Sequence, residues 1–503
     1  MARGVWLVLV GVCACGGDSS GSGDGSSSDA TSTGSSTGSD TTTSVSPTAG
    51  MTTVLDSSGS STGGQSSGSD TGFTEPEGPW APGVVFPSLP DPNPRGLYDL
   101  RGLVHTHSPY SHDACDDMPR DENDVIDPVC MADLRRGMCQ TRHDFIMLTD
   151  HGESFGRSEF PDVLLYDPDR GDTLVERDGM PTANWASCPA VDPVLVMAGT
   201  ETGMMPVGLE SHVPGDVYGE VDVATVQLYR DHGALTLLAH TEDWSVSQIV
   251  DLGVDGFEMY NLHANMLTNI GPAAILVQML QEGGEGLPHP DLVIFPLWQE
   301  DERYLETWGT VLSMGERPVT TMGSDAHRNT LPQELPDGER IDSFRRMMLW
   351  FSNHVLVDAE TWDDRAIKDA LRAGRAYGAF EYMGYPEGFD AFAESAAGVV
   401  ELGGEVSLGD APEIHAVAPV VHRLDPDVTA PEITLHLLRA LDGGFEEVAT
   451  GGSTLDFMPD EAGAYRVEVR MVPHHLDSHL GDYADQAGTP RVWIYANPFY
   501  VVE

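Results

Sequence analysis

Short apolar runs that end beside metal-binding side chains recur along the middle of this sequence and constrain its fold more than any other feature. Seven runs occupy positions 103–104, 145–148, 194–197, 235–238, 256–257, 292–295 and 318–322. Longer stretches with helical spacing separate them, which is typical of parallel strands joined by crossovers. Parallel strands bring their carboxyl ends to one face of a sheet or barrel. We therefore expect an α/β barrel with its chemistry at that face.

Nitrogen and oxygen donors follow these runs at a similar register. The candidate metal ligands are His105, His107, His112, His151, Glu201, His240, Asp325 and His327. In a strand, residues two apart point to the same side, so each His-x-His or Asp-x-His pair could reach one ion or two adjacent ions. Such donors suit Zn, Mn or Fe. One pair alone would be a weak indication, but the recurrence predicts a metal centre.

The chain is strongly acidic, with a formal net charge of −54 and Lys368 as its sole lysine among 503 residues. A surface of this charge repels phosphate backbones, so a role in coating nucleic acid is excluded. Bound metal ions would dominate the local field and could still attract an anionic substrate.

Four cysteines lie in the first folded region, at positions 115, 130, 139 and 188. In an exported chain they predict two disulfides, for which three pairings are possible. Free buried thiols are the alternative. A zinc knot is disfavoured because no CxxC spacing is present.

The N-terminus is typical of an exported protein. A short apolar run ends at Cys15, and the segment resembles a bacterial lipoprotein signal peptide (1–15) with Cys15 as the lipidated residue. A cleaved secretory signal is the alternative. Residues 16–72 are almost entirely Gly, Ser, Thr and Asp, so they should form a disordered tether. Residues 73–97 should form an extended lead-in.

The rest of the chain divides into two regions. Residues 98–385 alternate between strand-like and helix-like stretches, with helices expected at 223–233, 272–283, 302–314 and 363–373. Residues 395–503 instead alternate in short runs separated by Gly and Asp turns. They predict an antiparallel β-sandwich-like domain without an evident catalytic constellation.

Five motifs in order, HTH (105–107), TDHG (149–152), the Glu at 201, LLAH (237–240) and SDAH (324–327), resemble the polymerase and histidinol phosphatase (PHP) superfamily. This resemblance covers about residues 98–330. It implies a distorted (β/α)7 barrel holding two or three divalent ions, with Glu201 as a bridging carboxylate. His112 stands where the family often has Asp. Glu258, Asn261 or His263 could stand in for a further histidine ligand of the family.

Three more residues are candidates near the expected centre. His212 resembles a histidine that some family members place beside the metals, as a ligand, a phosphate contact or a proton donor; an ordinary loop residue is the alternative. Asp150 is expected to support the adjacent His151 rather than to react. Arg328, just after SDAH, is a candidate anion contact.

The expected function is metal-dependent hydrolysis of a phosphomonoester or phosphodiester at the cell envelope, by a hydroxide shared between two ions. A carboxylic or carbamic ester or amide is the alternative substrate class. A third hypothesis is a surface-anchored binding protein with an inactive barrel. The sequence leaves open the substrate, the metal and the oligomeric state.

Overall fold

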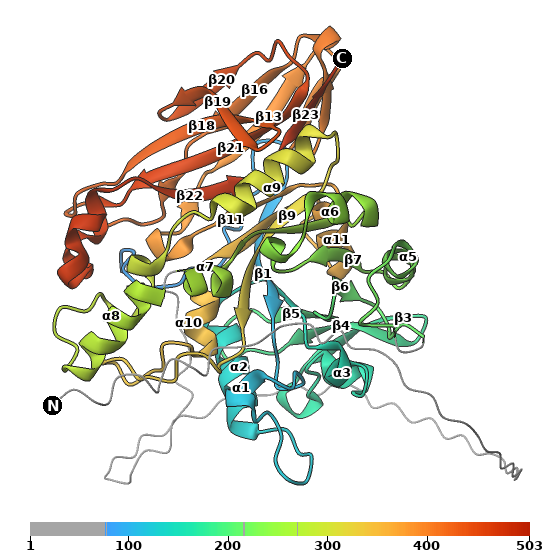
Figure 1. Cartoon of the computed structure of the whole chain (residues 1–503), viewed down its shortest axis with the longest axis vertical. Coiled ribbons are helices and arrows are strands. Elements are labelled where there is room, and N and C mark those ends of the chain that lie inside the picture. The colour runs from blue at the N-terminus through green and yellow to red at the C-terminus, as the bar shows by residue number, and fades with distance from the viewer. Residues whose placement is uncertain (1–75, 77, 215–216, 269) are drawn as a thin grey trace, which may run out of the picture. The chain divides into compact units, whose positions relative to one another are not determined.

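The computed structural model describes residue 76 and residues 78–214, 217–268 and 270–503, all within one compact unit (Figure 1). The expected signal peptide, its Cys15 and the tether lie outside the described residues. Among the described residues, no helix is both long and apolar enough to cross a membrane.

The centre of the fold is a closed, mixed barrel of seven strands. In barrel order these are β1 (Tyr98–Thr106), β2 (Phe145–Leu148), β5 (Val194–Gly199), β6 (Met205–Leu209), β7 (Leu235–Leu238), β8 (Gly256–Asn261) and β9 (Val319–Ala326). All neighbours are parallel except where β6 runs antiparallel to β5 and β7. The expected α/β barrel is therefore present in this coarser form.

One of the seven expected strands was placed wrongly. Residues 292–295 instead run from the end of the 3₁₀ helix η3 (Pro290–Leu292) through a turn into the 3₁₀ helix η4 (Phe295–Leu297). Prolines in the first turns of both helices favour helical φ values. The remaining barrel strand is β6, whose Pro206 and left-handed Gly208 (φ 71°) conceal it from a pattern-based prediction.

Helices connect and cover the strands. The longer ones are α2 (Pro128–Thr141), α5 (Val223–Asp231), α6 (Val246–Leu252), α7 (Leu262–Thr268), α8 (Ile270–Gln281), α9 (Glu302–Ser313), α10 (Phe344–Leu349) and α11 (Asp364–Arg372). The four expected helices correspond to α5, α8, α9 and α11. Asp222, Asp301 and Asp363 cap three of them by accepting backbone N–H groups of the first turn.

The C-terminal region is β-rich and contains two main sheets, besides the short pair formed by β12 (Pro386–Glu387) and β17 (Val420–Val421). The larger includes β15 (Glu405–Ser407), β18 (Glu432–Leu441), β19 (Gly444–Gly451), β21 (Gly463–Val472), β22 (Arg491–Ala496) and β23 (Phe499–Val502). The smaller has β13 (Asp390–Ser395), β14 (Gly398–Glu401), β16 (Glu413–Val417) and β20 (Thr454–Phe457). Residues from both sheets belong to the large buried apolar cluster that also includes barrel residues.

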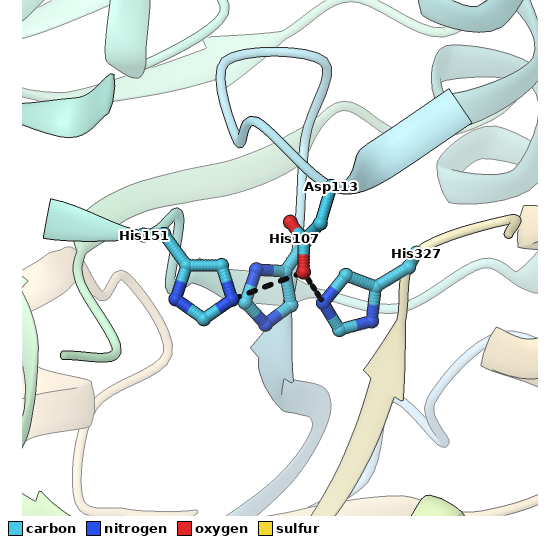
Figure 2. Close-up of side chains that lie close together, drawn as sticks. All are labelled: His107, Asp113, His151 and His327. Atoms are coloured by element: carbon cyan, nitrogen blue, oxygen red, sulfur yellow. Dashed lines mark hydrogen bonds and ion pairs between the residues drawn. The ribbon is translucent and has the colours of Figure 1, made fainter. Parts of the chain in front are cut away.

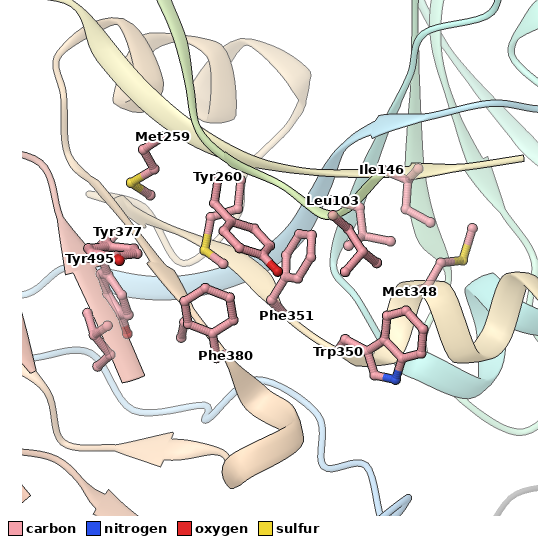
Figure 3. Packing of buried hydrophobic residues seen from close by; sticks show 14 of the residues in the cluster. Leu103, Ile146, Met259, Tyr260, Met348, Trp350, Phe351, Tyr377, Phe380 and Tyr495 are labelled. Carbon is pink, nitrogen blue, oxygen red and sulfur yellow. The ribbon is translucent and has the colours of Figure 1, made fainter. Parts of the chain in front are cut away.

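The larger C-terminal sheet is continuous with the barrel. β10 (Ser352–Val357) pairs with β1, β11 (Ala376–Ala379) with β10, and β22 with β11, all antiparallel. Aromatic side chains fill the junction, where Phe380 lies 4.9 Å from Tyr260 and 6.1 Å from Tyr495 between ring centroids (Figure 3). The β-rich region is thus joined to the barrel through both hydrogen bonds and core packing.

Both expected disulfides form. We call Cys115–Cys130 the loop disulfide, because it joins the segment after β1 to α2. We call Cys139–Cys188 the helix disulfide, because it joins α2 to the segment before β5. Each bridge therefore has one cysteine on α2, Cys130 or Cys139.

Candidate metal centre

The donor side chains gather at the carboxyl ends of the barrel strands, in unusual backbone conformations. His105, His240 and Asp325 have φ values of 69°, 49° and 51°. Side chains other than Gly rarely adopt this left-handed region, and such residues cluster at functional sites. At β1 the conformation coincides with an irregular register against β2 and β9 between Val104 and Thr106. A regular strand would not present the two histidines of HTH in this way.

Four donors form what we call the strand group: His105, His107, Glu201 and Asp325. The Nε2 atoms of the two histidines lie 3.1–3.3 Å from Glu201 Oε2 and Asp325 Oδ1. Ligands about 2.1 Å from a tetrahedral ion are about 3.4 Å apart, so these spacings match those around one ion. Both Nε2 atoms and Asp325 Oδ1 are buried without a hydrogen-bond partner. Buried polar atoms without partners are costly, and a divalent ion would satisfy them.

A second set, which we call the loop group, consists of His107, Asp113, His151 and His327. Figure 2 shows the Asp113 carboxylate between two rings, with Oδ2 3.0 Å from His151 Nε2 and 2.9 Å from His327 Nε2. The rings of His107 and His327 stack with centroids 3.7 Å apart. Because His107 belongs to both groups, two ions bound here would be neighbours.

Two further histidines extend the centre. His240 Nε2 lies 3.4 Å from Glu201 Oε1 and 3.3 Å from Asp325 Oδ2. His263 Nδ1 lies 2.9 Å from Asp325 Oδ2, and His263, Asp325 and His327 form a third possible metal-binding group. Each carboxylate therefore contacts histidines through both of its oxygens, as a bridging ligand would.

The Nδ1 atoms of the central histidines are held by the protein, which leaves their Nε2 atoms directed at the centre. His105 donates from Nδ1 to Glu258 (2.6 Å), His151 to the Glu201 backbone oxygen (2.7 Å) and His327 to the Asp325 backbone oxygen (2.9 Å). Metal-ligating histidines are usually oriented by such a bond.

Charge compensation between carboxylates and imidazoles stabilises this cluster. Burial alone would raise the pKa values of Glu201 and Asp325, but the surrounding histidines hold both well below their usual range. Burial alone would lower the pKa of His240, yet Asp325, Glu242 and Glu201 raise it to about 12. The cluster attracts positive charge, which protons or metal ions can supply.

One sequence-based prediction about the donors, that of His112, differs from the structure. His112 is exposed and is not among the donors of these groups; its ring packs against His151 with centroids 4.9 Å apart. The neighbouring Asp113 supplies the carboxylate instead, because the turn after Ser111 directs Asp113 inward. Ser111 Oγ donates a hydrogen bond to Asp113 Oδ1 (2.7 Å). In the sequence, the acidic residue next to His112 was the feature that could have indicated this ligand.

The contacts of His212 and Asp150 are structural and do not indicate a catalytic role. The nitrogens of His212 are bonded to the Tyr218 hydroxyl and the Ser158 backbone oxygen, both at 2.9 Å. Asp150 is buried and accepts bonds from the Ser108 backbone N–H (2.6 Å) and hydroxyl (2.7 Å). Asp150 thus supports the segment after β1 and not the adjacent His151 that it was expected to support, because His151 Nδ1 is bonded to the Glu201 backbone oxygen. His212 is occupied by structural bonds.

Buried polar groups around the centre support its ligands. Glu258, which the sequence marked as a possible ligand, bonds His105 through Oε1 and accepts from the His240 backbone N–H (2.9 Å) and the Asn261 amide (3.0 Å) through Oε2. The Tyr304 hydroxyl donates to Glu242, whose other oxygen lies 3.4 Å from His240 Nδ1. Sequence alone could not find Tyr304, because it comes from α9.

Comparisons with known proteins add little. No family model and no curated protein matches the chain. A solved structure, PsfC from Pseudomonas syringae PB-5123, aligns with a TM-score of 0.33 and 13% identity, covering 56% of this chain and 93% of that one. A TM-score this low does not indicate a shared fold.

Proposed function

We propose that this protein is a metal-dependent phosphoesterase of the PHP superfamily, with a distorted (β/α)7-type barrel and two or three divalent ions. The observation that carries the proposal is the strand group: four donors, three of them buried, are spaced as around one ion, and the buried Nε2 atoms of His105 and His107 lack other partners. The adjoining loop group supports a second ion that shares His107. The antiparallel β6 is compatible with a distorted barrel of this type.

Divalent ions held there would supply Lewis acidity and lower the pKa of water towards neutrality. The role of the surrounding residues is to orient the metal ligands. Glu258 and Glu242 orient histidines, and Asp150 holds the segment that carries the HTH motif to the centre. A preorganised cluster of this kind requires little rearrangement when substrate binds.

Hydrolysis of an ester, amide or carbamate is the second candidate, and one observation favours it. Arg328, the expected anion contact, lies 3.1 Å from Asp133, and Arg340 is paired with Asp116 and Asp342. These arginines are already neutralised by carboxylates, so a phosphate dianion would depend on the metal ions for its binding. A less charged ester would need no such cation.

Export, with a lipid anchor at Cys15, is the proposed location. Two disulfides support export, because disulfides persist in oxidising compartments. A small-molecule ester is the proposed partner.

The test combines elemental analysis of the purified chain with hydrolysis of matched aryl phosphates and aryl esters, with and without added Zn²⁺ or Mn²⁺. We expect two or three metal equivalents, lost together with phosphatase activity in His107→Ala and Asp325→Ala. Phosphatase activity should fall at least about a hundredfold, because both side chains would hold the ions that the reaction requires.

His436→Ala is the matched control, since His436 pairs with Glu447 on the exposed β18–β19 hairpin and should leave both readouts unchanged. Metal binding with ester hydrolysis alone would select the second candidate. A chain that binds no metal and hydrolyses neither substrate would contradict both and favour the binding-protein hypothesis.

A further inference from the structure

The loop group differs from the strand group in how its donors are held. His107, His151 and His327 follow barrel strands β1, β2 and β9, whose positions the barrel determines. Asp113 comes instead from the long connection between β1 and α2. Its place beside two histidine rings therefore depends on whatever holds that connection.

The segment that follows Asp113 has a strained backbone. Cys115, Asp116 and Asp117, in the short α1 (Ala114–Asp117), have φ values of 61°, 59° and 60°. Each of these L-residues is disfavoured in the left-handed region, and three in succession are uncommon. Such a conformation persists only where the surroundings impose it.

Covalent and ionic restraints impose it here. The loop disulfide ties Cys115 to α2, and Arg340 makes two hydrogen bonds of 2.7 Å to the carboxylate of Asp116. The backbone N–H groups of Cys115 and Asp116 donate to backbone oxygens just after β9, at 3.0 and 3.1 Å. The strained segment thus adjoins the same stretch of chain that carries His327.

Helix α2, to which the loop disulfide is attached, is packed tightly in the core. Gly137 lies against α10 so closely that an added Cβ would be 2.8 Å from the Arg345 backbone nitrogen. Cys130, Leu134 and Met138 are buried in the core. A bond from Cys115 to this helix therefore fixes the segment relative to the barrel.

We propose that the loop disulfide and Arg340 are positioning groups, which hold the strained segment so that Asp113 completes the loop group. The strand group does not depend on them, because its donors lie in barrel strands or directly after them. This inference rests on the metal centre of the proposed function. It divides that centre into one subsite formed by the barrel alone and one formed only when the loop is restrained.

The first test compares two disulfide variants of the full chain. Cys115→Ser/Cys130→Ser removes the loop disulfide, and Cys139→Ser/Cys188→Ser removes the helix disulfide as the matched control. Serine is used because free thiols could themselves bind zinc. After treatment with a chelator, each protein is titrated with Zn²⁺ by calorimetry, and bound metal is counted by elemental analysis.

We expect the loop-disulfide variant to bind one equivalent fewer than wild type, or to bind one ion at least about tenfold more weakly. The control should keep the wild-type count and affinities. Equal binding by both variants would overturn the inference, as would loss of every ion from a folded loop-disulfide variant.

Two further variants act with the disulfide intact. Asp113→Asn removes the donor itself, and Arg340→Gln removes the partner of Asp116. Both variants should bind the ion of the loop group more weakly and leave the affinity for the other ion unchanged. Adding the loop-disulfide substitutions to Asp113→Asn should cause no further loss, because both changes act through one side chain.

If the loop-disulfide variant fails to fold by circular dichroism, Arg340→Gln decides, and unchanged zinc binding by it would overturn the inference. A wild-type chain that binds no metal would instead contradict the proposed function. The two failures are therefore distinguishable.

Discussion

At the scale of single residues, the centre depends on side chains that would not themselves bind an ion. Glu258 is fully buried, and Gly323 faces it so closely that an added Cβ would lie 1.7 Å from Glu258 Oε1. The glycine in the MGSDAH stretch therefore makes room for the carboxylate that orients His105. The sequence shows both residues but cannot show that they meet.

Glu258→Gln should weaken metal binding by about 10- to 100-fold, because the neutral amide no longer orients and polarises His105 as a carboxylate does. Competition with a chromophoric chelator measures the affinity. Glu447→Gln removes a comparable carboxylate bonded to a histidine, His436, on an exposed hairpin and should have no effect. Equal affinities in the two variants would show that Glu258 does not act on the centre.

His354, a buried histidine away from the metal centre, contributes to folding stability and not to metal binding. His354 lies between Asp99 (2.9 Å) and Glu381 (3.1 Å). Burial alone would lower the pKa of His354, but the two carboxylates raise it to about 9. Because the folded pKa lies above the unfolded value, the stabilisation is fully present below pH about 6.5 and is lost as pH rises through about 9.

The rise in the pKa of His354 from 6.5 to about 9 corresponds to about 3 kcal/mol in the free energy of unfolding. Urea unfolding of wild type and His354→Gln at pH 6 and pH 10 tests it. Wild type should lose about 3 kcal/mol more than the variant between these pH values. Parallel losses in the two proteins would rule out this role for His354.

At the scale of elements, the barrel strands were largely predictable, and the exceptions have a physical cause. Six of the seven apolar runs fall on β1, β2, β5, β7, β8 and β9. Parallel strands buried on both faces appear in sequence as continuous apolar runs, which makes them easy to find. β6 is interrupted by Pro and Gly, whereas 292–295 is apolar because it is buried between two 3₁₀ turns.

Helix α9 shows how tightly the elements pack. An added Cβ on Gly309 would lie 1.8 Å from the backbone oxygen of Gly444 in β19, which cannot move away as a flexible side chain could. Gly309→Ala should therefore lower the free energy of unfolding by about 1–3 kcal/mol, despite the better helix propensity of Ala.

Gly488→Ala at the end of the 3₁₀ helix η8 (Gly481–Gly488) is the control, because a Cβ added to Gly488 would meet no atom within 4 Å outside its own stretch of chain. Urea unfolding should show it unchanged or slightly stabilised. Similar stabilities for the two variants would mean that the contact between α9 and β19 is not tight.

At the scale of the whole molecule, the two expected regions are not independent. The sheet passes from β1 through β10 and β11 to β22, and Phe380 packs on residues of both parts. The sequence distinguishes the regions by their hydrophobicity patterns, because buried parallel strands and half-exposed antiparallel strands have different patterns. These patterns cannot reveal that the two regions share one sheet.

A chain truncated after residue 394 should therefore fail to give a soluble, folded barrel. Truncation leaves the β11 edge without β22 and exposes aromatic side chains of the junction, both of which promote aggregation. A chain beginning at Gly72 keeps the whole compact unit and should fold. Soluble expression and circular dichroism compare the two, and a cooperative unfolding transition in residues 1–394 would contradict the prediction.

The sequence by itself determined which side chains are available for metal binding and which strands carry most of them. It did so because buried strands and the donors at their ends are local patterns. Only the tertiary structure decided that Asp113 rather than His112 completes the loop group, that His212 is occupied elsewhere, and that Glu258 supports His105. These outcomes depend on contacts between residues up to about two hundred positions apart, such as Asp113 with His327. Such contacts follow from how the whole barrel closes, not from any one segment.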